Sequence, residues 1–359
     1  MIQCGACLRP RPALLIAWAA LTGFWTVAAL AGEADPLFQD HTPLEVTLSG
    51  PLNALARDRD PEPERRPGTL TVLGGSDPAA TFAVELEPRG KSRRDRSVCT
   101  FPPLWVQFDK EQVKGTLFKK QDKLKLVTYC RSPKSFQDFV ILEYLAYRIF
   151  NELSPAASFR VRLLNISYEG SDGRGKPLTR YGFFIEHKKR LAKRLDTKVM
   201  EPTEQIPTST LDPEQASIAE LFQFMVSNTD FSLIGPPEND VCCHNTVLFD
   251  AGNGMYLPVP YDFDRTGLVN PPNGLPAAEL GQRNFRDRIY RGFCRDDAVM
   301  NAALEKTRAA RGIIEALIND QPQLSDRSKK SALKFIDSYY TIIDDDKRRA
   351  REVKCRDVS

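Results

Sequence analysis

The sequence predicts an α+β protein of two lobes, with an antiparallel-sheet lobe containing one helix at the N-terminal side and a mainly helical lobe at the C-terminal side. Short alternating apolar segments, typical of strands, dominate the first half, and apolar residues at helical spacing dominate the second. The length of 359 residues exceeds what one hydrophobic core usually organises. A charged segment and then a Pro- and Thr-rich segment follow residue 187, so we divide the mature chain into residues 32–195 and 196–359.

The first 31 residues have the pattern of a secretory signal peptide. Arg9 and Arg11 precede an apolar run, and Ala29-Leu30-Ala31 supplies the small residues for cleavage after Ala31. The run is also long enough for an uncleaved membrane anchor, but its Thr and Gly residues and the Ala-x-Ala ending favour cleavage. We therefore expect an exported protein, periplasmic or extracellular, with no stable membrane insertion after cleavage.

Six cysteines remain after cleavage, an even number that permits three disulfides in an oxidising compartment. We expect Cys99 to pair with Cys130, since both lie near strands in the same half of the chain. Adjacent Cys242 and Cys243 should then reach Cys294 and Cys355. A zinc site at Cys242-Cys243-His244 is a weak alternative, because three consecutive residues cannot surround a tetrahedral metal without strain.

The composition is that of a globular protein, and its formal net charge of +3 is too small to indicate a nucleic-acid partner. Alternating segments predict the strands of the first half, where a Gly-Gly-Ser-Asp turn joins the second strand to the third. Apolar residues at helical spacing between Ser135 and Pro155 predict one helix there. The expected strands of this half cover residues 44–49, 69–73, 81–86, 104–108, 123–128, 159–166 and 181–185.

The second half begins with an apolar helix over residues 217–226, which ends at the turn Asn228-Thr229-Asp230. A hairpin of residues 246–250 and 255–259 surrounds a Gly- and Asn-rich turn. Two long helices follow between residues 296 and 351, interrupted near Pro322.

Three polar motifs of the second half offer the groups that bind a metal and a phosphate. Asp262 leaves an apolar strand and is the expected principal metal ligand, with Asn245 as the second; Asp230 follows an apolar helix and would orient or deprotonate an acceptor hydroxyl. Asp264 is either a further metal ligand or the cap of the next turn. All these residue types also form turns, but a carboxylate that emerges from a buried strand usually needs a ligand or partner.

Positive charge for phosphates comes from the first half. Lys125 lies on a predicted strand, and Glu143 on the following helix could hold its ammonium group in an ion pair. Lys123 shares the strand face and Glu152 the helix, and both stay as alternatives. Arg89 begins a basic segment that could wrap a phosphate, although it lacks the spacing of a Walker loop and could equally be an exposed turn.

These segments together resemble the CotH family of secreted atypical protein kinases, first named from spore-coat proteins. The resemblance covers roughly residues 44–267 and rests on short motifs. It is carried by Glu87-Pro88-Arg89-Gly90, Lys123-Leu124-Lys125-Leu126-Val127, Glu143-Tyr144-Leu145-Ala146-Tyr147-Arg148, Phe183-Phe184-Ile185-Glu186, Asn228-Thr229-Asp230, His244-Asn245 and Tyr261-Asp262-Phe263-Asp264.

The resemblance implies a two-lobed atypical protein-kinase-like fold that binds ATP and Mg²⁺ or Mn²⁺ and phosphorylates Ser or Thr hydroxyls of exported proteins. The family's acidic positions correspond to Asp230 and Asp262, and the backbone of Glu186 would meet the nucleotide base. The cysteine-bearing insertion before Asn245 departs from the family, and the loop and catalytic strings of ordinary kinases are missing. A noncatalytic binding or surface-interaction protein on the kinase frame and a metal-dependent hydrolase are the alternatives.

Overall fold

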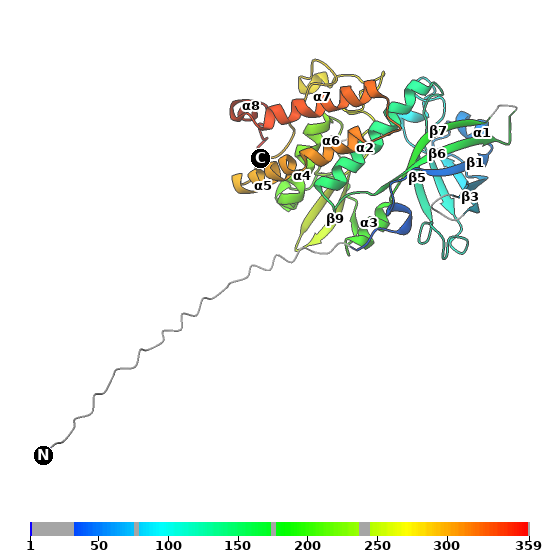
Figure 1. Ribbon diagram of the computed structural model, residues 1–359, viewed down its shortest axis with the longest axis horizontal. Coiled ribbons are helices and arrows are strands. Elements are labelled where there is room, and N and C mark those ends of the chain that lie inside the picture. Colours follow the sequence, from blue (N-terminus) through cyan, green and yellow to red (C-terminus); the bar gives the residue numbers. More distant parts are fainter. Residues whose placement is uncertain (2–31, 75–78, 174–176, 237–244, 358–359) are drawn as a thin grey trace. The chain divides into compact units, whose positions relative to one another are not determined.

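Seven strands from the first half of the chain close into a barrel in the order β1-β2-β3-β4-β5-β7-β6 (Figure 1). The computed structural model describes residues 1, 32–74, 79–173, 177–236 and 245–357. Neighbouring strands are antiparallel except for β1 and β6, whose parallel pairing closes the barrel. The barrel strands are β1 (Leu44–Gly50), β2 (Arg66–Val72), β3 (Ala80–Pro88), β4 (Leu104–Phe108), β5 (Lys123–Val127), β6 (Val161–Gly170) and β7 (Leu178–Ile185).

The period of two along these strands divides their side chains between the barrel interior and the outer surface. On β4, Leu104, Val106 and Phe108 are buried, whereas Trp105 between them is only partly buried. On β5, Leu124 and Leu126 are buried and Lys125 is partly exposed. Trp105 and Lys125 are direct cross-strand partners, so the outer surface of the barrel presents them side by side.

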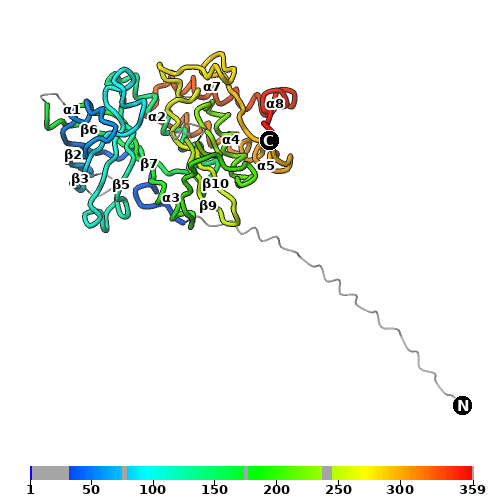
Figure 2. Tube along the Cα trace, turned by 180° about the vertical axis from the view of Figure 1, so that it is seen from behind, coloured from blue at the N-terminus to red at the C-terminus, as the bar shows by residue number. Residues whose placement is uncertain are grey.

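The remaining elements are helices and a three-stranded sheet of order β10-β9-β8. In Figure 2 this small sheet lies beside α4. The sheet contains β8 (Val199–Met200), β9 (Thr246–Gly252) and β10 (Met255–Pro260). The helices are α1 (Leu52–Arg57), α2 (Gln137–Leu153), α3 (Lys188–Arg194), α4 (Pro213–Val226), α5 (Asp297–Ala309), α6 (Arg311–Asn319), α7 (Asp326–Ile343) and α8 (Asp346–Glu352).

Helix α2 joins the barrel to the helices of the second half. It contacts β6 and β7 of the barrel and also α4 and α6, and Figure 1 shows it between the two groups of elements. Thirteen of its residues are buried, which explains why its apolar pattern is so strong in the sequence. Side chains placed along this one helix can therefore reach both halves of the chain.

The predicted fold class is wrong. The first half is a closed barrel of mixed strands rather than an open antiparallel lobe, and the second half carries a sheet beside its helices, so the chain does not have the two-lobed kinase-like fold with a helical C-terminal lobe. The strand positions were predictable from local alternation. Closure was not, because it depends on the parallel pairing of β1 with β6, which lie more than a hundred residues apart.

The other differences are local. Helices α1 and α3 were not expected: α1 precedes the charged loop before β2, and α3 forms within the charged segment that we assigned to a boundary. The predicted break near Pro322 lies between α6 and α7, but each expected long helix is itself divided, at Ala310 and around Asp344. The turn at residues 75–78 lies outside the described residues.

One predicted disulfide is confirmed, and the predicted partners of Cys294 and Cys355 are wrong. Cys99 bonds Cys130, with 4.6 Å between their Cα atoms. Cys294 bonds Cys355 rather than the Cys242-Cys243 pair, because the chain returns beside Phe293, where Arg356 forms a parallel bridge with it. Cys242, Cys243 and His244 lie outside the described residues.

Two features of the described residues concern the predicted export of the protein, namely its disulfides and the character of its helices. Structural disulfides persist in oxidising compartments, so the two observed bonds are compatible with an exported protein. Within the described ranges, no helix combines the length and the apolar character needed to cross a bilayer. The predicted signal peptide lies outside those ranges.

Candidate functional site

A cavity of about 400 Å³, which we call the first cavity, collects residues from eight separate parts of the chain. Residues that follow β3 and β10, residues of β5 and α2, and the loops after α4 and before β9 all line it. Seven of the eight predicted site residues are among them. They are Arg89, Lys125, Glu143, Asp230, Asn245, Asp262 and Asp264.

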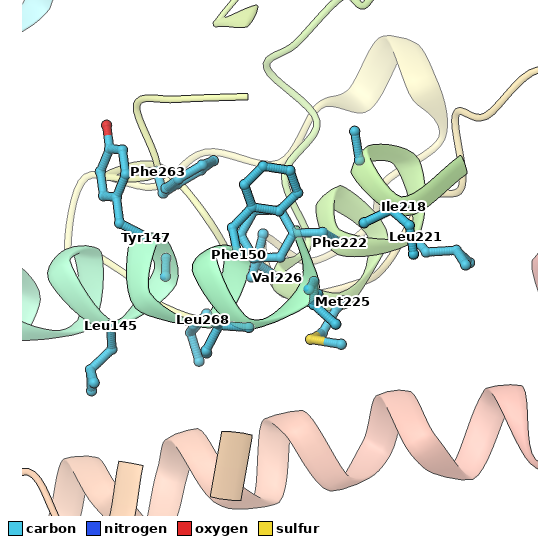
Figure 3. Close-up of a cluster of buried hydrophobic side chains, with 14 of the residues drawn as sticks. Leu145, Tyr147, Phe150, Ile218, Leu221, Phe222, Met225, Val226, Phe263 and Leu268 are labelled. Carbon is cyan, nitrogen blue, oxygen red and sulfur yellow. The ribbon is translucent and has the colours of Figure 1, made fainter. Parts of the chain in front are cut away.

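The segment after β10 presents two carboxylates because the residue between them is anchored in the core. The Phe263 ring is fully buried and lies 4.6 Å from the ring of Tyr147 and 5.1 Å from that of Phe222. Figure 3 shows Phe263 among side chains of α2 and α4. With Phe263 fixed, Asp262 and Asp264 on either side are directed to the cavity.

Asp262 is held in an unusual backbone conformation. Its φ of +63° lies in the left-handed region, and its backbone N–H donates a hydrogen bond of 2.9 Å to the Tyr147 hydroxyl. Non-glycine residues in this region are uncommon and often occur at functional sites, where the surrounding structure enforces them. Two contacts hold Asp262 in this conformation: the hydrogen bond of its own N–H to the Tyr147 hydroxyl, and the buried ring of the next residue, Phe263.

The Asp262 carboxylate is desolvated and lies beside a second carboxylate. Burial, and then the neighbouring Asp264 carboxylate, raise its pKa, while the Arg93, Arg89 and Lys125 cations oppose that shift. In the described part of the chain, no ion pair reaches this carboxylate, whereas Asp264 is paired. A desolvated carboxylate beside a second carboxylate is stabilised by an added cation.

Two loops bring Asp230 and Asn245 to the cavity. Helix α4 ends at Ser227 in a left-handed conformation, and the Asn228 side chain then accepts a hydrogen bond of 2.9 Å from the Asp230 backbone N–H. Arg291 donates to the carbonyls on either side of Asp230, those of Thr229 and Phe231.

The Asn245 amide nitrogen donates to the Asp230 carbonyl at 2.7 Å, so the two loops are joined directly. Asn245 has a φ of +47°, and its carbonyl accepts from the Tyr261 N–H at 3.0 Å, which connects it to the segment that carries Asp262. Burial raises the pKa of Asp230, and the nearby Arg265 guanidinium opposes that shift. A carboxylate in this state is suited to accept a proton.

The cations of the first cavity surround an indole ring on the outer surface of the barrel. The Lys125 ammonium lies 5.7 Å from the Trp105 ring centroid and 4.5 Å from that of Tyr261, and the Arg89 guanidinium lies 5.4 Å from Trp105. Burial, and then the charge of Arg89, lower the pKa of Lys125 to about 7. Aromatic faces stabilise these cations while no described carboxylate pairs with Lys125.

Glu143 forms its ion pair with a different cation from the one expected. Its carboxylate lies 2.6 Å from Arg93 Nη2, and Arg93 Nε lies 2.5 Å from Asp264, so among the described residues the partner of Glu143 is Arg93 and not Lys125. We call Arg93, Glu143 and Asp264 the ion triad. Burial raises the pKa of Glu143 and Arg93 opposes it, while the two carboxylates raise the pKa of Arg93.

Glu186 is the predicted residue that stays away from the first cavity. Its buried carboxylate pairs with Arg194 at 3.0 Å, and its backbone N–H donates to the Arg160 carbonyl. Ile185, the last residue of β7, lines the cavity in its place. The charged pattern of residues 188–194 predicts a boundary and not a helix, so the pairing of Glu186 with α3 was not predictable.

Sequence reasoning overlooked three residues of the site. Tyr147 shares a helix face with Glu143 four residues earlier, and this spacing could have indicated it. Arg93 lies in the basic segment that begins at Arg89, but its partners Glu143 and Asp264 are distant in sequence, so no local pattern indicates the pairing. Arg265 directly follows the predicted acidic motif and lines the first cavity as well.

The oxygen donors fit a cation that is completed by a ligand. Within the described ranges, no three His, Cys, Asp or Glu side chains converge as a ready metal centre. Mg²⁺ commonly uses only one or two protein carboxylates, together with phosphate oxygens and water. Asp262 and the Oδ1 of Asn245, whose amide nitrogen is already engaged, match that smaller set.

The site thus defines a class: a cavity with desolvated carboxylates, an amide and two cations, Lys125 and Arg89, that pair with no described carboxylate, a set of groups that can bind an anion together with a metal ion. Comparison of the chain with models of protein families, with curated proteins and with solved structures finds no match. The resemblance to the CotH family therefore stays a prediction, and the groups of the first cavity are what indicate a function.

Proposed function

We propose that the first cavity binds ATP with a divalent cation and transfers the terminal phosphoryl group to a Ser or Thr hydroxyl of an exported protein. The observation that carries the proposal is the Asp262 carboxylate, which is desolvated, lies beside Asp264 and has no ion-pair partner among the described residues. The two disulfides are compatible with an exported protein, which would meet exported acceptors, and the CotH-like motifs direct the proposal to hydroxyls.

Asp262 and Asn245 would hold the cation, Mg²⁺ or Mn²⁺. When bound, such an ion neutralises charge on the phosphate oxygens. Lys125 and Arg89 would bind the oxygens that the cation leaves free, and their aromatic neighbours keep both cations at the cavity wall. The apolar side chains of Pro103, Val127 and Ile185 in the same lining could contact the nucleotide base.

Asp230 would take the proton of the acceptor hydroxyl. As the acceptor oxygen forms its bond to the terminal phosphorus, the bond from that phosphorus to the bridging oxygen of the leaving diphosphate breaks. The raised pKa of Asp230 makes its carboxylate a better proton acceptor than an exposed aspartate. Arg93 would take no part directly, because its guanidinium is engaged by Glu143 and Asp264.

ATP affinity should depend on pH through Lys125. A lysine with a pKa of about 7 is largely protonated at pH 6 and largely neutral at pH 8. Phosphate binds the protonated form, so affinity should fall as pH rises through 7, by up to about tenfold per pH unit. Calorimetric titration with ATP and Mg²⁺ at pH 6, 7 and 8 measures this effect.

Lys125→Gln should weaken ATP binding at pH 6 and flatten the pH dependence. Lys123→Gln is the matched control, since Lys123 lies on the same strand face and is paired with Glu87. An equal pH dependence in Lys125→Gln would show that another group titrates.

The proposal is tested with the purified protein, γ-labelled ATP, Mg²⁺ or Mn²⁺, and a panel of exported proteins that includes the protein itself. We expect labelled Ser or Thr, and Asp230→Asn should reduce transfer by about 10²- to 10⁴-fold while ATP still binds. ATP binding without transfer to any protein would indicate a noncatalytic binding protein. Absence of ATP binding under both metals would reject the proposal.

A further inference from the structure

A second cavity of about 390 Å³ adjoins the first. The two share four lining residues, namely the ion triad and Arg265. Because Arg93 is paired with both Glu143 and Asp264, the ion triad forms a fixed partition between them. Nothing in the proposed phosphoryl transfer uses the second cavity, although its volume lies in the range of small-molecule sites.

Most of the second cavity is apolar. Helix α2 and the turn before it supply Phe136, Phe139 and Val140, and the rings of the two phenylalanines meet edge to face at 5.4 Å. Val98 and the Cys99–Cys130 disulfide form another wall, and Val269 and Pro271 a third. Such a lining favours the aromatic or branched apolar part of a ligand.

Arg265 supplies this apolar space with a cation that forms no hydrogen bond or ion pair with the described residues, although its charge acts on the nearby Asp230. Its buried Nε atom has no hydrogen-bond partner in the described part of the chain. The other two arginines of the lining are engaged: Arg93 in the ion triad, and Arg131 with the carbonyls of Val98 and Ser97. A buried donor without a partner is costly, and an anionic acceptor is its strongest partner.

We propose that the second cavity is a binding site for a small amphipathic anion, with an aromatic or branched apolar body against Phe136, Phe139 and Val140 and a carboxylate or phosphate on Arg265. This inference does not depend on the proposed transfer reaction. Because Arg265 also lines the first cavity, where it acts on Asp230, a ligand bound there is coupled to the first site.

Three probes of equal apolar body test the site: 3-phenylpropionate, 2-phenylethyl phosphate and the neutral 3-phenylpropanol. Titrations followed by NMR or calorimetry should give at least about tenfold tighter binding for an anion than for the alcohol, as expected for a charge-assisted bond. The two anions distinguish a carboxylate site from a phosphate site. Equal affinity of all three probes, or no binding, would overturn the proposal.

Variants of the lining residues show which of the two cavities the probes occupy. Arg265→Gln should remove the preference for the anions, whereas Arg131→Gln should keep it, because Arg131 is already bound to backbone carbonyls. Lys125→Gln should also keep it, and loss of the preference there would mean that the probes occupy the first cavity. Asn273→Trp, at an exposed position of the cavity lining, should block all three probes without disturbing the core. Unchanged binding in Asn273→Trp and Val140→Phe would overturn the assignment.

Discussion

Asp262→Asn is expected to slow phosphoryl transfer strongly and to stabilise the fold at the same time. The substitution removes the charge that would hold the cation, and loss of one such electrostatic contact typically reduces the rate by about 10²- to 10³-fold. It also removes a carboxylate that burial and Asp264 disfavour. Transfer assays and thermal unfolding of the same preparations measure both effects.

The stability gain should depend on pH. The pKa of Asp262 rises from the ordinary aspartate value of 3.8 to about 6 in the fold, so the folded protein binds this proton more tightly than the unfolded chain does. A raised carboxylate pKa makes the fold less stable as pH increases from about 4 to 6, and the penalty is complete above 6. Asp262→Asn should therefore raise the melting temperature at pH 7.5 and have little effect at pH 4.

Asp250→Asn is the matched control, because Asp250 is an exposed aspartate on β9, outside the lining of either cavity. It should change neither transfer nor the pH dependence of unfolding. A fall in stability for Asp262→Asn at pH 7.5 would contradict the view that this carboxylate is uncompensated.

The residues of the first cavity were more predictable than the fold around them. Asp262, Asp230 and Asn245 stand beside strongly apolar elements, and polar residues at the ends of buried strands and helices carry a local signal. Lys125 carries a weaker signal, since it alternates with apolar residues on β5 in the same way as Lys123, the alternative. Each of these residues could be chosen without knowledge of its neighbours in space.

Partners in space were less predictable, because they depend on contacts between distant segments. The sequence gives no indication that β1 pairs with β6, or that Arg93 instead of Lys125 reaches Glu143, since each contact joins segments that are far apart in the chain. The same limit applies to the cysteines. Cys99 and Cys130 could be paired through neighbouring strands, but the return of the chain beside Phe293 decides the partner of Cys294.

Arg93→Ala is expected to destabilise the protein strongly, although Arg93 lies in a segment that resembles an exposed basic turn. The substitution leaves Glu143, whose side chain is 3% exposed, and Asp264, which is 20% exposed, without their shared cation. Breaking a buried pair by removal of one partner costs about 3–5 kcal/mol. Urea unfolding at pH 8 measures the loss, and Arg96→Ala at an exposed neighbouring position should cost less than about 0.5 kcal/mol.

The pH dependence of the stability loss in Arg93→Ala shows whether Arg93 stabilises the fold through its ion pairs or through packing. Without Arg93, burial and the repulsion of Asp264 raise the pKa of Glu143 further above that of the unfolded chain, so the variant is destabilised at high pH and recovers as Glu143 binds a proton. The deficit should therefore be largest at pH 8 and smaller at pH 5. Glu143→Gln introduced into Arg93→Ala should recover part of the loss at pH 8, because it removes one unpaired charge. A deficit that is equal at both pH values and unaffected by Glu143→Gln would mean that Arg93 stabilises the fold by packing, and that the partition between the two cavities does not depend on charge.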